Sequence, residues 1–233
     1  MIPSPNNPEA PLRRDDLKGE GAIRGTARME AFADGVFAIA FTLSVFQIVL
    51  PDGSRDSANL GSDLLGILPA YGGYLLASMV IGLYWVHHHF SGAIYRTTGH
   101  WFLVASVIFL AAIGFIAFPA RVFAEHFGDP VARPVASQYL VISLALLSAT
   151  WLVKWTVGRL RGQVDARLDP VYVDRLDRHY RHLFFGHAIA AILVFFKWEV
   201  GLGVSALLTL RLLLPPETPQ YTTESPVVEG EGN

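Results

Sequence analysis

The amino-acid sequence predicts an all-α protein that crosses a membrane several times. Its 233 residues are 52% hydrophobic and only 16% charged, with a mean hydropathy of +0.38, whereas soluble domains carry about 25% charged residues. The apolar residues form uninterrupted stretches close to the roughly 20 residues that a helix needs to cross a hydrocarbon core of about 30 Å. These stretches lack the alternating pattern of a transmembrane β-barrel, so helices are the predicted spanning elements.

Four apolar stretches are long enough to span the bilayer alone, and two shorter ones follow near the C-terminus. Only Lys197-Trp198-Glu199 separates the short pair, which predicts a tight hairpin of two short helices, with an interfacial or partly re-entrant pair as the alternative. The six predicted transmembrane helices are 31–50, 64–86, 101–119, 136–157, 183–196 and 199–214.

The two ends of the chain differ sharply from this predicted transmembrane domain, residues 28–214. Residues 1–27 are polar and rich in Pro and Gly, without the apolar core of a signal peptide, so a disordered tail is expected there. Residues 215–233 are rich in Pro, Thr and Glu, a composition that also predicts a disordered tail.

Basic residues are distributed unevenly between the two sides of the predicted bundle, which indicates its orientation. With six spans, one side holds Arg13, Arg14, Lys18, Arg24, Arg28, Arg96, Arg159, Arg161, Arg167, Arg175, Arg178 and Arg181. The other side holds Arg55, Arg121, Arg133 and Lys197. The positive-inside rule therefore predicts cytoplasmic N- and C-termini.

The segment 158–182 mixes Arg and Asp at helical spacing. Asp174 with Arg178, and Asp177 with Arg181, are four residues apart, so each pair can form an ion pair on a helix surface. A solvated cytoplasmic helix surface is the preferred interpretation, with ligand binding as the alternative.

Composition and motifs exclude several function classes. A net charge of −2 gives no basic surface for nucleic acid, and the absence of cysteine removes disulfides and thiolate metal sites. The predicted spans contain no activated nucleophile, metal triad or paired carboxylates, so no catalytic residue, enzyme activity or cofactor is expected.

The first span carries an apolar repeat that indicates a fixed neighbour. At about 100° per residue, its members lie within about 60° of one direction, with the 4-3-4-3-4 spacing of a heptad seam. The seam consists of Phe32, Val36, Ile39, Leu43, Phe46 and Leu50. The rest of this helix is also apolar, so spacing alone separates the seam only weakly from a lipid-facing surface.

Polar residues gather at the predicted cytoplasmic ends of the first two spans. Asp34 lies away from the seam, at the same depth as the stretch GLYWVHHHF, residues 82–90. A charged side chain near the membrane needs a partner or water, so Asp34 is expected to accept a hydrogen bond from Trp85 or from a histidine.

The three consecutive histidines are not expected to hold a metal ion. Successive residues on a helix diverge by about 100°, so His87, His88 and His89 cannot converge on one ion. A hydrogen-bonded structural cluster is the preferred interpretation, and a proton-sensing role is the alternative because histidine titrates near neutral pH.

The stretches RMEAFADGVFAIAFTL and GLYWVHHHF, together with FIAFPARVF, resemble the prokaryotic branch of the transmembrane protein 175 family of potassium channels. The resemblance is strongest over residues 28–50 and 82–90, and weaker to about 214. Ala33 stands where the family usually has Ser, His87 where it has Asn, and Phe46 where it tends to have Leu.

The resemblance implies a homotetramer in a prokaryotic plasma membrane, with a central pore for K⁺ and other monovalent cations lined by the first helix. Ile39 would form the narrowest apolar ring, followed by Leu43 and Phe46, and Thr42 would add hydroxyls beside it. The implied polar network behind the pore consists of Arg28, Asp34, Trp85, His88 and His89. Selection and gating would depend on the hydrophobic constriction, because the chain has no carbonyl filter of the TVGYG type.

Two other functions remain open at the level of the sequence. A proton-coupled secondary transporter would use Asp34 and the histidines as a relay, although the chain has no internal hydropathy repeat. A purely structural membrane subunit would show no ion flux.

Overall fold

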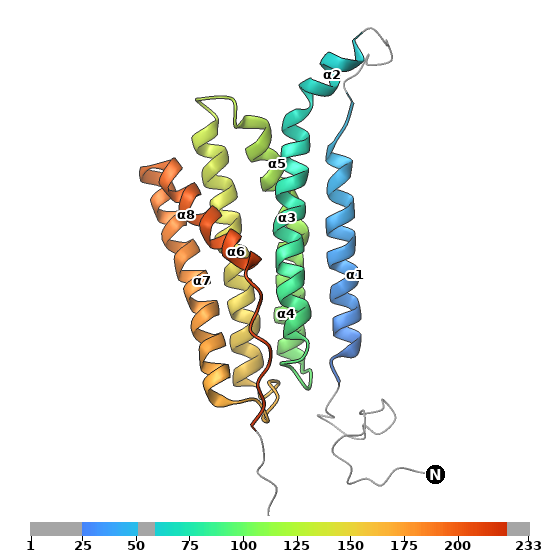
Figure 1. The fold of residues 1–233 in the computed structure, drawn as a ribbon, viewed down its shortest axis with the longest axis vertical. Coiled ribbons are helices and arrows are strands. Elements are labelled where there is room, and N and C mark those ends of the chain that lie inside the picture. The colour runs from blue at the N-terminus through green and yellow to red at the C-terminus, as the bar shows by residue number, and fades with distance from the viewer. Residues whose placement is uncertain (1–24, 51–58, 223–233) are drawn as a thin grey trace, which may run out of the picture.

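The structure, a computed structural model, describes residues 25–50 and 59–222 and forms a bundle of long helices (Figure 1). The described ends of the chain lie at the same end of the bundle, which is the lower end in Figure 1. The described residues contain helices and two isolated β-bridges. In chain order the helices are α1 Ala27–Leu43, the 3₁₀ helix η2 Ser44–Gln47, α2 Leu60–Gly66, α3 Leu68–Ser91, α4 His100–Phe115, α5 Ala117–His126, α6 Arg133–Leu160, α7 Pro170–Phe196, α8 Trp198–Leu210 and η3 Arg211–Leu213.

Several of these helices are long and apolar enough to cross a membrane. Four qualify without interruption, and α2 with α3 forms a fifth candidate that bends by 45° at its break. At about 1.5 Å per residue, the 13 residues of α8 reach only about 20 Å, so this helix falls short of a full crossing. The four uninterrupted candidates are Ala27–Gln47, His100–His126, Arg133–Leu160 and Pro170–Phe196. A polytopic helical membrane protein is thus confirmed, while six crossings stay a prediction.

Helix α7 is longer than the predicted span 183–196, because the Arg- and Asp-rich residues before that span belong to the same helix. Asp169 caps its start by accepting hydrogen bonds from the backbone N–H groups of Val171 (2.6 Å) and Tyr172 (3.4 Å). Pro170 follows at the first helical position, where its missing N–H costs nothing. The Asp-Pro pair is a helix start that the hydropathy pattern alone overlooks.

Ion pairs fasten this polar first half of α7 to α6. Of the two predicted pairs along the helix, Asp177 with Arg181 is present at 2.7 Å. Asp174 instead pairs with Arg159 of α6 at 3.2 Å, and Asp177 also accepts a hydrogen bond of 2.8 Å from Trp155 Nε1 of α6. The segment therefore packs against a neighbouring helix in addition to presenting a solvated surface.

The last two helices form the predicted tight hairpin. A single residue, Lys197, joins α7 to α8, and its extended backbone turns the chain. A Cβ added to Gly201 of α8 would lie 2.5 Å from the backbone nitrogen of Val194, so only glycine allows the two helices to approach this closely.

The core between α1, α3, α4, α6 and α7 consists mainly of aromatic rings. Trp151 of α6 contacts Tyr84 of α3 edge-on, with ring centroids 5.3 Å apart, and Phe109 of α4 at 4.9 Å. Such perpendicular ring pairs contribute about 0.5–1.5 kcal/mol each beyond the area they bury. Phe37 of α1 is buried against this cluster at 6.1 Å from Phe109. The buried aromatic cluster consequently fixes one face of α1 to the bundle.

The C-terminal strap, Leu214–Thr222, extends from η3 along α7 to the lower end of the bundle (Figure 1). The N–H of Thr222 donates to the carbonyl of Arg167 (2.9 Å), and the N–H of Asp169 donates to the carbonyl of Gln220 (2.9 Å). The Tyr221 hydroxyl reaches the carbonyl of Ala93 after α3 (3.2 Å). These residues fall in the tail predicted to be disordered, yet they pack on the bundle. The remaining residues of both predicted tails lie outside the described part of the chain, apart from 25–27.

The loop before α7 contains a buried carboxylate that makes the fold sensitive to acid. Asp165 is 7% exposed and accepts hydrogen bonds from the guanidinium of Arg167 (2.8 Å) and from its backbone N–H (3.0 Å). The hydrogen bond from the Arg167 side chain is the main cause that holds the pKa of Asp165 below its ordinary value, against the opposing effect of burial.

Because this folded-state pKa lies below the unfolded value of about 3.9, the carboxylate stabilises the fold above that pH and ceases to do so as the pH falls through the lowered pKa. We expect Asp165→Asn to lower the unfolding temperature at neutral pH. The unfolding temperature of this variant should then fall less than that of the unmodified protein as the pH is lowered. Thermal unfolding in detergent across the acid range measures both effects. Equal acid sensitivity in the two proteins would contradict the assignment.

Candidate functional site

The exposed face of α1 carries the residues of the predicted seam. The helix turns Met29, Ala33 and Phe37 into the bundle, where each is buried. Ile39 and Leu43 point away from it and are 58% and 52% exposed. The exposed seam residues therefore face away from the core of the described bundle, whereas Val36, also in the seam, is partly buried against that core.

The short 3₁₀ helix after α1 brings Phe46 into line with this face. In a 3₁₀ helix, residues three apart lie directly above one another, so Phe46 in η2 stands above Leu43, the residue that precedes η2. The Phe46 side chain is 73% exposed. A regular α-helix through residue 50, as the predicted span implies, would rotate Phe46 away from Leu43 by about 60°.

A groove runs along each flank of α1, so the helix stands out as a ridge at the edge of the bundle (Figure 1). One groove, of about 370 Å³, includes Ile39 and Leu43 and borders Phe118 at the α4–α5 junction. The other, of about 640 Å³, includes Asp34 and borders Trp85 of α3. A ridge between two grooves is a shape that a neighbouring element can cover on both sides.

Thr42 adds a polar atom to this apolar face. Its hydroxyl donates a hydrogen bond to the carbonyl of Ala38 (2.8 Å), one turn earlier. Because the proton is used within the helix, the oxygen keeps its lone pairs free to accept from water or to coordinate a cation. The side chain is exposed and borders the groove on the Trp85 flank of α1, next to the one that includes Leu43.

The predicted contact between Asp34 and Trp85 is present. Trp85 Nε1 donates to Asp34 Oδ1 at 3.0 Å, joining α1 to α3. His89, one turn further along α3, packs on the Trp85 ring at 5.6 Å between centroids. Asp34, Trp85 and His89 therefore form one cluster on the exposed side of the α1–α3 pair.

The other two members of the predicted network lie apart from this cluster. His88 is buried on the opposite side of α3, where its ring lies 5.3 Å from Phe37 and 6.0 Å from Phe109. The Arg28 side chain makes no hydrogen bond or ion pair with residues 25–50 or 59–222. His88 thus supports α1 from behind by packing, and Arg28 is exposed at the start of the helix.

Trp85→Phe keeps an aromatic ring at this position but removes its N–H. We expect the variant to lose roughly 1 kcal/mol of stability, because the Asp34 carboxylate loses a hydrogen-bond donor. Thermal unfolding in detergent measures the loss. Trp101→Phe on α4 is the matched control, since this indole is 57% exposed and makes no hydrogen bond with a described residue; an equal effect of both changes would contradict the role of the hydrogen bond.

The sequence interpretation overlooks a buried ammonium group behind α1. Lys154 of α6 is only 3% exposed. Its Nζ lies over four aromatic rings, with centroid distances of 5.5 to 5.9 Å. A cation–π contact that is shielded from water stabilises a fold by about 2 kcal/mol. The rings belong to Tyr95, Phe102, Phe109 and Trp151.

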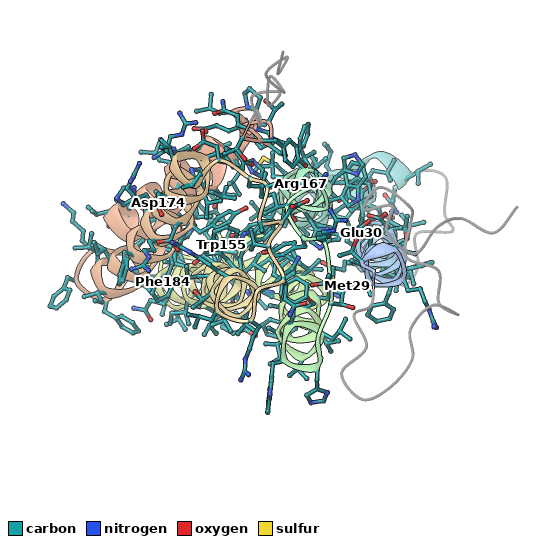
Figure 2. The ribbon with its side chains drawn as sticks, turned by 90° about the horizontal axis from the view of Figure 1, so that it is seen from below. Met29, Glu30, Trp155, Arg167, Asp174 and Phe184 are labelled. Atoms are coloured by element: carbon teal, nitrogen blue, oxygen red, sulfur yellow. The ribbon has the colours of Figure 1, made fainter. Side chains whose placement is uncertain are left out.

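Glu30 in the first turn of α1 is the carboxylate that attracts this ammonium. Figure 2 views the molecule from the end where α1 begins and shows Glu30 and Met29 on the side of α1 that faces the other helices. A Cβ at Gly92 would lie at ordinary contact distance, 3.5 Å, from the Glu30 carboxyl, so the carboxylate lies beside the end of α3. The WLVKW stretch, in which one lysine interrupts an apolar span, is the pattern that identifies Lys154.

Within the described ranges, no group of three His, Cys, Asp or Glu side chains has the arrangement of a metal site. The three consecutive histidines separate as helical geometry requires. His87 Nε2 lies 2.9 Å from the Leu212 carbonyl, His88 is in the core, and His89 packs on Trp85.

Comparisons with known proteins agree with the resemblance seen in the sequence. Residues 28–117 match the family model described as endosomal/lysosomal potassium channel TMEM175. A potassium channel of Chamaesiphon minutus is 34% identical over 196 residues, covering 81% of this chain and 94% of the relative. One of Streptomyces collinus is 26% identical over 186 residues, covering 79% of this chain and 90% of the relative. Among solved structures, the crystal structure of a lysosomal potassium-selective channel TMEM175 homolog from Chamaesiphon minutus matches with a TM-score of 0.66 and 28% identity, covering 81% of this chain and 96% of that one.

Proposed function

The chain belongs to the TMEM175 family of potassium channels, and we propose that it conducts K⁺ through a pore lined by the exposed face of α1. Ile39, Leu43 and Phe46 form the constriction, and Thr42 supplies an oxygen beside it. The relatives are named as potassium channels, so the chain is a multi-pass membrane channel protein rather than an enzyme.

The observation that carries this proposal is the unpartnered seam of α1. A helix that only needs to meet acyl chains has no reason to align three large side chains on one line, yet η2 brings Phe46 above Leu43. Asp34, on the same helix as the seam, pairs with Trp85 of α3 at the groove on the other flank of α1. A carboxylate facing lipid costs several kcal/mol, so this side of the subunit is better suited to water or protein than to lipid.

We propose a homotetramer in which four α1 ridges surround the pore axis. The grooves beside α1 can each receive part of a neighbouring subunit, so that the α1 helices pack side by side. The heptad spacing suits helices that pack around a common axis. Native mass spectrometry of the purified protein tests the subunit count: a mass of four chains is expected, and a lone chain would overturn the proposal.

We propose that the described ends of the chain face the cytoplasm of a prokaryotic cell, with the protein in the plasma membrane. The positive-inside rule supports this orientation, because the Arg-rich α6–α7 loop lies at the same end of the bundle as both described ends. In this arrangement α8 and the C-terminal strap return the chain to the cytoplasmic side as the sixth crossing.

Gating follows from the chemistry of the constriction. A narrow ring of apolar side chains expels water and blocks ions, and it conducts when dilation allows it to stay wet. K⁺ loses its water more easily than Na⁺, which favours K⁺ at such a bottleneck, and the Thr42 oxygens replace part of the lost hydration. The Asp34–Trp85 pair, with His89 packed on the Trp85 ring, supports the pore helix from its flank, and His88 supports it from the core.

Ion flux into liposomes tests the function. Purified protein is expected to give K⁺ flux that exceeds Na⁺ flux, increases with concentration without early saturation, and needs no proton gradient. A proton-coupled transporter would instead show saturable flux that collapses with the gradient and disappears in Asp34→Asn. No flux at all would indicate a structural subunit.

A further inference from the structure

A cavity of about 250 Å³ lies between α3, α7 and the C-terminal strap, and the proposed function does not use it. None of its lining residues belongs to α1, so it is separate from the proposed pore face. Its charged and titratable side chains are His87, Tyr172, Arg175, His179, Arg211 and Glu217. We call this space the strap cavity.

Two histidines form one wall of the strap cavity. The rings of His87 and His179 lie nearly parallel, 8° apart in plane and 6.4 Å between centroids. His87 Nε2 lies 2.9 Å from the carbonyl of Leu212, which fixes its ring in the wall. Because His87 Nε2 donates to that carbonyl, its neutral imidazole has no second N–H to offer, whereas His179 can donate a hydrogen bond to a ligand in the cavity.

Two arginines with unused side-chain donors also line the cavity, and Arg175 lies one turn before His179 on α7. Arg175 Nε is buried and makes no hydrogen bond with a described residue, although Glu217 Oε2 lies 3.4 Å away. The Arg175 Nη2 group donates to Gln220 Oε1 of the strap at 3.0 Å. The side chain of Arg211 makes no hydrogen bond or ion pair with any residue that the structure describes.

The charges of this lining do not balance. Two guanidinium groups face a single carboxylate, Glu217, which lies on the strap and is 57% exposed. A buried guanidinium N–H without an acceptor is costly, so an anion with several oxygens would complete the site better than Glu217 does.

We propose that the strap cavity binds a phosphate group, which displaces the Glu217 carboxylate from Arg175. The planar donor fork of arginine matches phosphate oxygens, and the imidazole of His179, one turn from Arg175 on α7, adds a donor. The phosphate belongs to a soluble phosphate compound or to a lipid headgroup. The cavity is at the end of the bundle that we propose faces the cytoplasm, where anionic headgroups lie.

Thermal unfolding of the full chain in nanodiscs of neutral lipid tests the soluble source, with inorganic phosphate as the probe and chloride at equal ionic strength as the reference. Nanodiscs with and without a phosphatidylinositol phosphate test the lipid source. Stabilisation by inorganic phosphate assigns a soluble ligand, and stabilisation by the lipid alone assigns a headgroup. No stabilisation by either probe, or the same stabilisation by chloride, would overturn the proposal.

Four variants, one of them a control, locate the site. Arg175→Gln and Arg211→Gln are expected to abolish the stabilisation, whereas Arg178→Gln, an exposed arginine on the same helix and outside the cavity, keeps it. Glu217→Gln removes the competing carboxylate and is expected to tighten binding several-fold. Because Glu217 is exposed, this variant tests the site even if an arginine variant does not fold. Weaker binding in Glu217→Gln, or equal loss in Arg178→Gln, would contradict the assignment.

Discussion

Ile39→Asn and Leu43→Asn are each expected to raise Na⁺ flux at least about tenfold and to reduce the preference for K⁺. A tenfold change corresponds to about 1.4 kcal/mol removed from the barrier. An amide in the ring keeps water in the constriction, so an ion no longer has to shed its hydration there. Both side chains lie on the exposed face of α1, so neither change leaves a hole in the core of the subunit.

Liposome flux of K⁺ and Na⁺, measured on the same preparations, gives the result. Ile189→Asn on α7 is the matched control, because Ile189 is 55% exposed compared with 58% for Ile39 and lies far from α1 in the bundle. The control should leave both fluxes unchanged. If Ile39→Asn and Leu43→Asn behave like the control, these residues do not form the constriction.

Lys154→Ala should destabilise the protein by about 3 kcal/mol. The change removes a buried side chain from among four rings, and such truncations cost about 2–5 kcal/mol. It also removes the cation–π attraction and leaves Glu30 without the ammonium that it attracts. Lys154→Met keeps most of the volume and should cost much less, about 1 kcal/mol.

A double-mutant cycle with Glu30→Gln and Lys154→Met isolates the interaction between α1 and α6. Glu30→Gln alone leaves a buried ammonium without its carboxylate, so it should destabilise the protein, and Lys154→Met should remove most of that penalty. Unfolding midpoints in detergent measure all four proteins. A coupling energy near zero would mean that the two charges do not fasten α1 to the bundle.

The hydropathy pattern predicted most of the fold, because the bilayer sets both the length and the polarity of a spanning helix. It fails where polar residues continue a helix: the Arg- and Asp-rich turns of α7 have no apolar signature, although Asp169 and Pro170 mark their start. It also cannot predict the C-terminal strap, whose order depends on backbone contacts with Arg167 and Ala93 that lie far away in the sequence.

The candidate site could be predicted in part. Matching depth in the bilayer was enough to pair Asp34 with Trp85, but helical geometry places His88 on the other side of α3, in the core. The line from Leu43 to Phe46 depends on the switch to a 3₁₀ helix, which periodicity alone does not reveal. The cage around Lys154 draws its rings from three parts of the chain, so only the folded structure brings it together.

The central claim, that the exposed face of α1 lines a shared pore, is tested most directly by block with Cd²⁺. The chain has no cysteine, so Leu43→Cys introduces a single thiol per subunit, and four thiols around one axis would bind the ion. We expect Cd²⁺ to block K⁺ current in Leu43→Cys and to leave the unmodified channel and Ile189→Cys unaffected. The account would be contradicted if Cd²⁺ left the K⁺ current through Leu43→Cys undiminished and a thiol reagent dissolved in the lipid labelled the cysteine, because the residue would then face lipid.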